Sequence, residues 1–206
     1  MPLSKESATR ADLLAKLRAQ KTPQVALPSY PANAIRYADP RAQFIDTLTG
    51  IGGRCEIVAD WADAARRIAE EAVVRDAQHM VQAVTRLPFA DERVVDLNAI
   101  DDPHALEWID VAIMPGEFAV AENGAVWCTD AGLKHRVTYF LSQHVVVCVP
   151  ARAGSQHARS VRASVAGRAG VRHVLGRPFE NGRHRAIAGH RRDGARSLTV
   201  YLIESV

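Results

Sequence analysis

Apolar residues recur along the chain at two spacings, one helical and one typical of strands. Helical spacing covers residues 9–20, 42–48, 61–74 and 78–84, so each of these segments is predicted to be a helix. Short apolar runs bounded by turn formers predict strands at 55–58, 93–97, 111–114, 118–120, 125–128, 145–149 and 198–203. Strands that alternate with helices indicate an α/β protein, with a mainly parallel sheet sandwiched by helices.

The first 36 residues differ from the remainder of the chain. A helix is expected there, with Thr9 and Asp12 in a loose capping box, followed by an extended connector that contains Pro28 and Pro31. We therefore predict an N-terminal helical arm over residues 1–36 and one domain over residues 37–206. The strand at 145–149 is apolar on both faces, as expected in a covered parallel sheet.

Length and composition are those of a soluble globular protein. The chain has 206 residues, of which 48% are hydrophobic and 24% charged, and no apolar run approaches the length needed to cross a membrane. The charged N-terminal segment does not resemble an export signal, so a cytoplasmic location is expected. Cys55, Cys128 and Cys148 lie far apart, which predicts free thiols and argues against an iron-sulfur or zinc site on this chain.

The segment 154–192 departs from this pattern. It holds nine arginines, no lysine and a single acid, Glu180, so it carries about +8 and the remainder of the chain about −5. Such a basic stretch is typical of nucleic-acid binding, which is one interpretation of it. The segment shows no sustained period of either kind, although it lies between two clear strands.

A compensated frameshift is the interpretation that we favour for residues 154–192. When the codons allowed for residues 177–191 are read from the second base, they permit the string GPSKTADIEQSLVIG, and the same shift permits VANMHEAYARV from Gly154 onward. A single-base slip near Gly154 and an opposite slip near Asp193 would account for the whole segment. From Gly194 onward the original reading frame applies again, and the sequence reads GARSLTVYLI.

The centre of the chain resembles a known family. From Asp101 to Ala151 the sequence reads DDPHALEWIDVAIMPGEFAVAENGAVWCTDAGLKHRVTYFLSQHVVVCVPA, which is similar to the LUD (lactate utilisation) family, as are the ending GARSLTVYLI and the decoded GPSKTADIE. The best-known members of that family are the lactate utilisation C proteins. Many of its members have Thr or Ser where this chain has Ala125.

The resemblance implies both a fold and a role. The implied fold is that of the NagB, RpiA and CoA-transferase group, and the implied role is participation in oxidation of L-lactate to pyruvate. It also implies separately encoded partner subunits that carry the iron-sulfur clusters, with no cofactor and no metal on this chain. The chain would then be a non-redox accessory subunit with a pocket for a small carboxylate or acyl group.

Glu122, Asn123 and Gly124 are the first candidate site residues. They resemble the S-E-N-G motif of CoA transferases, in which the glutamate is the nucleophile, so Glu122 is a candidate catalytic residue and its two neighbours are candidate ligand-binding residues. The alternative interpretation is structural, with Glu122 in a hairpin turn and Gly124 at positive φ. The decoded GPSKT would begin a helix that could hold an anion beside this turn.

His135, Arg136 and His144 are the second group, because cations at these positions could bind a small acid such as lactate. Asp102 with His104 instead indicates a helix cap. Three functions remain open: an accessory subunit of lactate oxidation, a stand-alone acyl or CoA transferase or ligase that uses Glu122, and nucleic-acid binding through residues 154–192. The last of these is disfavoured if the frameshift is real.

Overall fold

The computed structural model describes residues 4–19, 37–130, 132–150, 172–175 and 195–205. The chain divides into two compact units, Met1–Ala34 and Ile35–Val206. In the first unit, helix α1 spans Ser4–Ala19 and confirms the helix predicted there. The predicted capping box is wrong, because Thr9 and Asp12 lie inside the helix rather than at its start. The connector predicted up to residue 36 lies outside the described residues.

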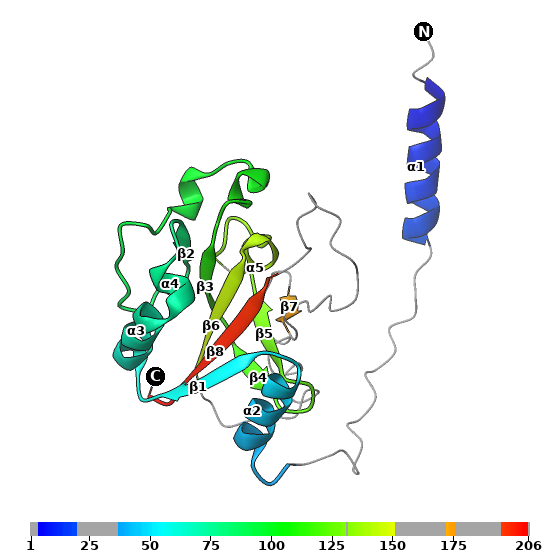
Figure 1. Cartoon of the computed structure of the whole chain (residues 1–206). Helices are drawn as coiled ribbons and strands as arrows, with labels where there is room; N and C mark the ends of the chain where they lie inside the picture. The colour runs from blue at the N-terminus through cyan, green and yellow to red at the C-terminus, as the bar shows by residue number, and fades with distance from the viewer. Residues whose placement is uncertain (1–3, 20–36, 131, 151–171, 176–194, 206) are drawn as a thin grey trace, which may run out of the picture. The chain divides into compact units, whose positions relative to one another are not determined.

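The second unit is built on a five-stranded parallel sheet with the order β1-β8-β6-β3-β2 (Figure 1). Its strands are β1 (Arg54–Val58), β2 (Met80–Gln82), β3 (Val111–Pro115), β6 (His144–Pro150) and β8 (Ser197–Ile203). Hydrogen bonding joins the whole length of β6 to β8, from His144 opposite Ser197 to Pro150 opposite Ile203. Five consecutive residues of β6 are buried, which confirms the prediction that this strand is covered on both faces.

Helices cover one face of this sheet. Helix α3 (Trp61–Glu70) and the short α4 (Ala72–Arg75) lie over a core that includes Val146, Tyr201 and Ile203. Asp60 begins α3 by accepting a hydrogen bond from the Asp63 amide at 2.8 Å. The single helix predicted over residues 61–74 is interrupted at Glu71, whose ψ of 135° is that of extended backbone.

The other face is covered by two helices and a second, smaller sheet. Helix α2 (Pro40–Gly50) and the short α5 (Thr138–Leu141) contribute Phe44, Leu48 and Tyr139 to this core. The small sheet is antiparallel, with the order β4-β5-β7, and comprises β4 (Phe118–Val120), β5 (Ala125–Thr129) and β7 (Arg172–Leu175). The prediction of an α/β fold with a mainly parallel sheet and helices on its faces is therefore confirmed, and the small sheet is an addition to it.

Gly116 explains how the small sheet approaches the large one. It directly follows β3, and its amide donates to the carbonyl oxygen of Cys148 at 2.9 Å. A Cβ atom at this position would lie 2.7–2.8 Å from side-chain atoms of Val126, Val147 and Val149. Glycine is therefore required where the chain leaves one sheet for the other.

Two predicted elements between α4 and β3 are wrong. Within residues 78–84 the chain forms the three-residue edge strand β2 rather than a helix, since the apolar residues Met80, Val81 and Val84 are also compatible with a buried strand. Residues 93–97 form no strand beyond a single bridge between Val94 and Met80. Arg93 explains this, because its guanidinium bonds the carbonyl oxygens of three residues at the end of α4, namely Val74, Arg75 and Ala77, at 2.7–3.1 Å.

The connection from β2 to β3 contains two short 3₁₀ turns, η1 (Leu97–Ala99) and η2 (Pro103–Leu106). Asp102 accepts a hydrogen bond from the His104 amide at 2.9 Å, which confirms the predicted cap.

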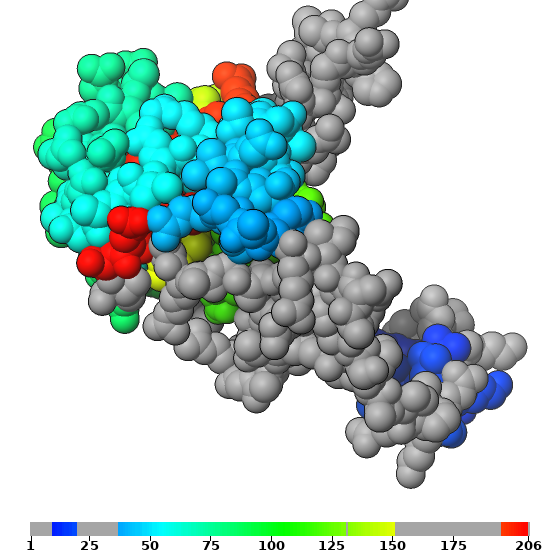
Figure 2. All heavy atoms as spheres, turned by 90° about the horizontal axis from the view of Figure 1, so that it is seen from below, coloured from blue at the N-terminus to red at the C-terminus, as the bar shows by residue number. Residues whose placement is uncertain are grey.

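The residues after β8 lie beside the first turn of α2 (Figure 2), where Arg41 and Glu204 form an ion pair at 2.5 Å. Apart from β7, the segment 154–192 lies outside the described residues.

Candidate functional site

Residues 121–124 form the turn that joins β4 to β5, as the structural interpretation of the Glu122 motif predicts. The Gly124 amide donates to the Val120 carbonyl oxygen at 3.0 Å, and Asn123 Oδ1 accepts from the Ala125 amide at 3.1 Å. Gly124 has a φ of +68°, and a Cβ atom there would lie 2.9 Å from the backbone nitrogen of Leu48 in α2. Gly124 is thus required twice, by its own backbone conformation and by its contact with α2.

Glu122 and Asn123 are exposed at the tip of this turn. Within the part of the chain that the structure describes, no hydrogen bond or ion pair involves the Glu122 carboxylate. The turn itself is held against α2, where the Thr47 hydroxyl donates to the Ala121 carbonyl oxygen at 3.2 Å. Glu122 therefore presents a solvated carboxylate on a fixed turn.

His135 is buried and its ring is engaged by the protein. Its Nε2 lies 2.6 Å from the carbonyl oxygen of Ile100, so this nitrogen is the donor. The His135 carbonyl oxygen in turn accepts from the Thr138 hydroxyl at 2.7 Å at the start of α5. Arg136, next in the chain, is exposed. Of these two predicted ligand-binding residues, His135 anchors a loop and Arg136 faces solvent.

His144 begins β6 and therefore lies at the amino-terminal edge of the parallel sheet. Its Nδ1 is 2.7 Å from the Ser197 hydroxyl at the start of β8. Burial lowers the pKa of His144, the charge of Arg196 lowers it further, and Asp110 opposes both effects. Among the described residues, no hydrogen bond or ion pair joins His144, His135 or Arg136 to the Glu122 turn.

The carboxyl end of β3 holds a polar group that sequence reasoning missed. Glu117 follows Gly116 at this end, and its Oε1 accepts a hydrogen bond from the Thr129 hydroxyl at 3.1 Å. Tyr139 reaches the same place from α5, where its hydroxyl donates to the carbonyl oxygen of Pro115 at 2.9 Å. Burial raises the pKa of Tyr139, and the neighbouring Cys128 raises it further, so the hydroxyl keeps its proton.

This location matters because open α/β sheets bind their ligands outside the carboxyl ends of the parallel strands. A sequence signal for it exists: Gly116 and Glu117 come immediately after a buried apolar strand. Glu117 is half-buried, so its carboxylate is partly desolvated while it remains reachable. We therefore regard the group formed by Glu117, Thr129 and Tyr139, called the β3-end cluster below, as the better placed candidate site.

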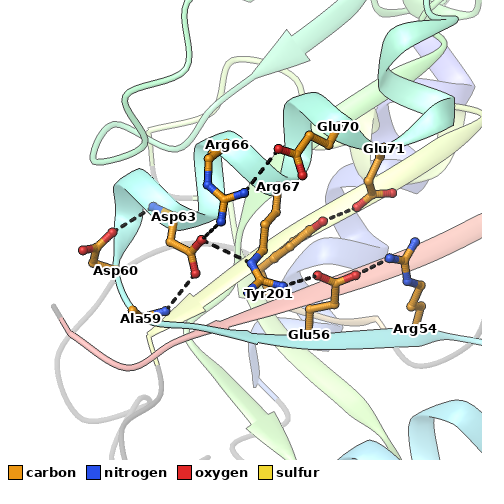
Figure 3. A network of polar contacts seen from close by, with 10 residues as sticks. All are labelled: Arg54, Glu56, Ala59, Asp60, Asp63, Arg66, Arg67, Glu70, Glu71 and Tyr201. Carbon is orange, nitrogen blue, oxygen red and sulfur yellow. Dashed lines mark hydrogen bonds and ion pairs between the residues drawn. The ribbon is translucent and has the colours of Figure 1, made fainter.

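A third polar group links α3 to β1 and β8 (Figure 3). Basic and acidic side chains alternate in this group. Arg67 forms ion pairs with both Asp63 and Glu56, and Arg66 forms ion pairs with both Asp63 and Glu70. The Tyr201 hydroxyl donates to the buried Glu71 carboxylate at 2.5 Å. These ion pairs join α3 to β1, and the Tyr201–Glu71 bond joins β8 to the end of α3, so the network holds α3 on the sheet.

The cysteines are free, as predicted, and burial keeps two of them unreactive. Cys128 and Cys148 are buried, and loss of hydration raises the pKa of each thiol to about 12. Among the described residues, no three His, Cys, Asp or Glu side chains gather closely enough to hold a metal ion. None of the helices described is long and apolar enough to span a bilayer.

Comparison with solved structures identifies a protein with a similar fold. The chain is similar to the crystal structure of a DUF162 family protein from Deinococcus radiodurans, with a TM-score of 0.58 and 21% sequence identity over 80% of this chain and 96% of that one. No family model and no curated protein matches the sequence. At this level of identity the likeness establishes the α/β fold.

Proposed function

We propose that this chain is an accessory LUD-domain subunit in the oxidation of L-lactate to pyruvate, acting beside separate subunits that carry iron-sulfur clusters. The observation that carries the proposal is that the sequence resemblance and the fold comparison lead to the same family. DUF162 is the name of the LUD domain, and the stretch Asp101–Ala151 that resembles that family contains β3, β4, β5 and β6.

The chemistry of the chain supports a binding role rather than electron transfer. Two of its thiols are buried and protonated at neutral pH, and the third, Cys55, also has its pKa raised to about 12 by burial. Binding of a small carboxylate or acyl group is assigned to the β3-end cluster. Thr129 and Glu117 could bond the hydroxyl group of a 2-hydroxy acid there, since a carboxylate accepts such a bond readily.

Deletion and complementation in the source organism test the proposal. Loss of this gene is expected to abolish growth on L-lactate while growth on pyruvate is unchanged, and a tagged copy should restore growth and co-purify with iron-sulfur subunits. Normal growth on lactate after deletion would contradict the proposal. Detection of the tagged copy in the cytoplasmic fraction of lysed cells tests the expected location.

A second candidate is a stand-alone acyl or CoA transferase that uses Glu122. The exposed carboxylate on a rigid turn, without an ion pair among the described residues, is the observation that favours it, because a nucleophile must be reachable. Replacing Glu122 by Gln separates the two candidates: the accessory role predicts retained growth on lactate, whereas the nucleophile role predicts its loss. Trapping of an acyl-enzyme with hydroxylamine gives a second, direct readout.

The frameshift at residues 154–192 stays a proposal as well, and tandem mass spectrometry of the purified protein tests it. Peptides containing GPSKTADIE are expected, and with them loss of most of the basic charge. Peptides that contain the nine arginines would contradict the frameshift and would favour nucleic-acid binding instead.

A further inference from the structure

The connection from β2 to β3 carries a dense negative charge. Residues 96–110, called the acidic platform here, hold five acidic side chains and no lysine or arginine. The acidic residues are Asp96, Asp101, Asp102, Glu107 and Asp110, and all but Asp110 are exposed. In Figure 1 this segment is the green stretch of loops and short turns that leads into β3.

The acidic platform is fixed to the body of the domain. Leu97, Leu106 and Ile109 point into the core and are 9%, 0% and 0% exposed. From the loop before α5, Lys134 Nζ donates to the Asn98 carbonyl oxygen and to Asp101, each at 2.8 Å. Together with the bond from His135, these contacts make the platform a rigid surface rather than a free loop.

An aromatic side chain stands within this acidic surface. Trp108 is 37% exposed, and its ring is held edge-on against His79 with the ring centroids 4.5 Å apart. Tryptophan in a fixed, partly exposed position is the residue type that contributes most to protein interfaces. The surrounding carboxylates select for a partner with basic side chains.

Helix α1 has the complementary properties. It exposes three leucines, Leu13, Leu14 and Leu17, by 58%, 39% and 56%, spaced so that they share one side of the helix. Its sixteen residues include four basic and two acidic side chains. A helix of this length is only marginally stable in water unless its apolar side is packed against something.

We propose that α1 of one copy of this chain docks on the acidic platform of a second copy. The leucines cover Trp108, and the basic side chains Arg10, Lys16 and Arg18 lie beside the carboxylates. Exchange of arms between two copies closes a symmetric dimer in which each platform is occupied. The inference is independent of the proposed function, and because one helix buries a small area, the dimer is expected to be weak and salt-sensitive.

Light scattering on the full chain over a series of protein concentrations tests the proposal. The molar mass is expected to rise from one copy toward two at low salt and to return to one copy at about 0.5 M salt, where the Debye length is only a few ångströms. The variants Trp108→Ala and Leu17→Asp should each remain at one copy at concentrations where the parent chain pairs.

A charge exchange distinguishes docking at this surface from pairing elsewhere. Asp102→Lys and Lys16→Glu should each weaken the dimer at least tenfold, and the two together should restore much of it. Asp46→Lys, on the exposed side of α2, makes the same charge change away from the platform and should leave the dimer intact. Circular dichroism confirms that each variant is folded.

Two results would overturn the inference. The first is one copy at every concentration, as expected if the platform is covered within its own chain or by another protein. The second is a dimer that is unaffected by Trp108→Ala and Leu17→Asp.

Discussion

The β4-β5 hairpin carries a glutamate near each of its two ends, and the two differ in almost every physical respect. Glu117, where β4 leaves the large sheet, is half-buried, accepts a bond from Thr129, and lies at the carboxyl end of a parallel strand. Glu122, at the turn, is exposed and lies on a tip that packs against α2. The comparison shows that resemblance to a catalytic motif and location in a binding region are separate properties.

Gly124→Ala is expected to have the largest effect on stability, because it tests whether the Glu122 turn is a structural element. A side chain at φ +68° is strained by about 1–2 kcal/mol, and contact with the Leu48 backbone adds about 1–3 kcal/mol. Gly52→Ala is a matched control, since Gly52 has a φ of +88° but nothing within 4 Å of an added Cβ. Urea unfolding should show a clearly larger loss for Gly124, and equal losses would contradict the packing argument.

Tyr139→Phe tests the other end of the hairpin. It removes a hydroxyl that donates to Pro115 in a largely buried place, so the free energy of unfolding should fall by about 1–2 kcal/mol. Thermal unfolding followed by circular dichroism measures this loss. An unchanged melting temperature would mean that the hydroxyl contributes nothing to the cluster.

Thr129→Val sharpens the comparison by removing only the bond to Glu117. A loss of about 0.5–1.5 kcal/mol in the free energy of unfolding is expected from chemical denaturation. Binding of lactate, measured by calorimetry, should weaken at the same time if the β3-end cluster holds the ligand. Retention of both stability and binding would remove Thr129 from the site.

His144→Gln tests whether His144, whose ring contacts Ser197 at the amino-terminal edge of the large sheet, has a structural role. The folded-state pKa of His144 lies below its ordinary value of 6.5, so folding favours the neutral ring. Its contribution to stability is therefore present above pH 6.5 and is lost as pH falls through the folded-state pKa. The variant should show a flatter fall in stability over that acidic range than the parent chain, as measured by urea unfolding at a series of pH values.

Glu122→Gln is expected to have the smallest effect on stability, with no measurable change in urea unfolding. The carboxylate is exposed and forms no ion pair among the described residues. A substantial loss would show that Glu122 has a partner that the described residues do not include.

Most strand positions, although not those of β2 and β7, could be predicted from sequence because buried strands leave short apolar runs. Residues 145–149 and 198–203 fall inside β6 and β8, and α2 is found where residues 42–48 predict it. Residues 78–84 are compatible with a helix or a strand, because their three apolar residues fit either period, and pairing with the neighbouring β3 decides for a strand. At the break between α3 and α4, the Glu71 carboxylate accepts a bond from Tyr201, a contact across 130 residues that local sequence does not reveal.

The candidate site was harder to predict than the fold. The Glu122 motif led to residues that the structure places in a turn, while Glu117 stands five positions earlier with no motif of its own. Only the arrangement of strands shows that Glu117, Thr129 and Tyr139 meet, because they come from three separate elements. The sequence marks His135 as a candidate cation for ligand binding, but its Nε2 donates to the Ile100 carbonyl oxygen and so anchors a loop.

Growth on L-lactate of strains that carry Glu117→Gln or Glu122→Gln in the chromosomal gene tests the central claim most directly. Both changes remove one negative charge from the same hairpin, so each strain is the control for the other. The account predicts that Glu117→Gln slows growth on lactate at least tenfold while Glu122→Gln grows like the parent, with equal protein levels in both. Normal growth of the Glu117 strain together with loss of growth in the Glu122 strain would contradict it and would favour a glutamate nucleophile at the turn.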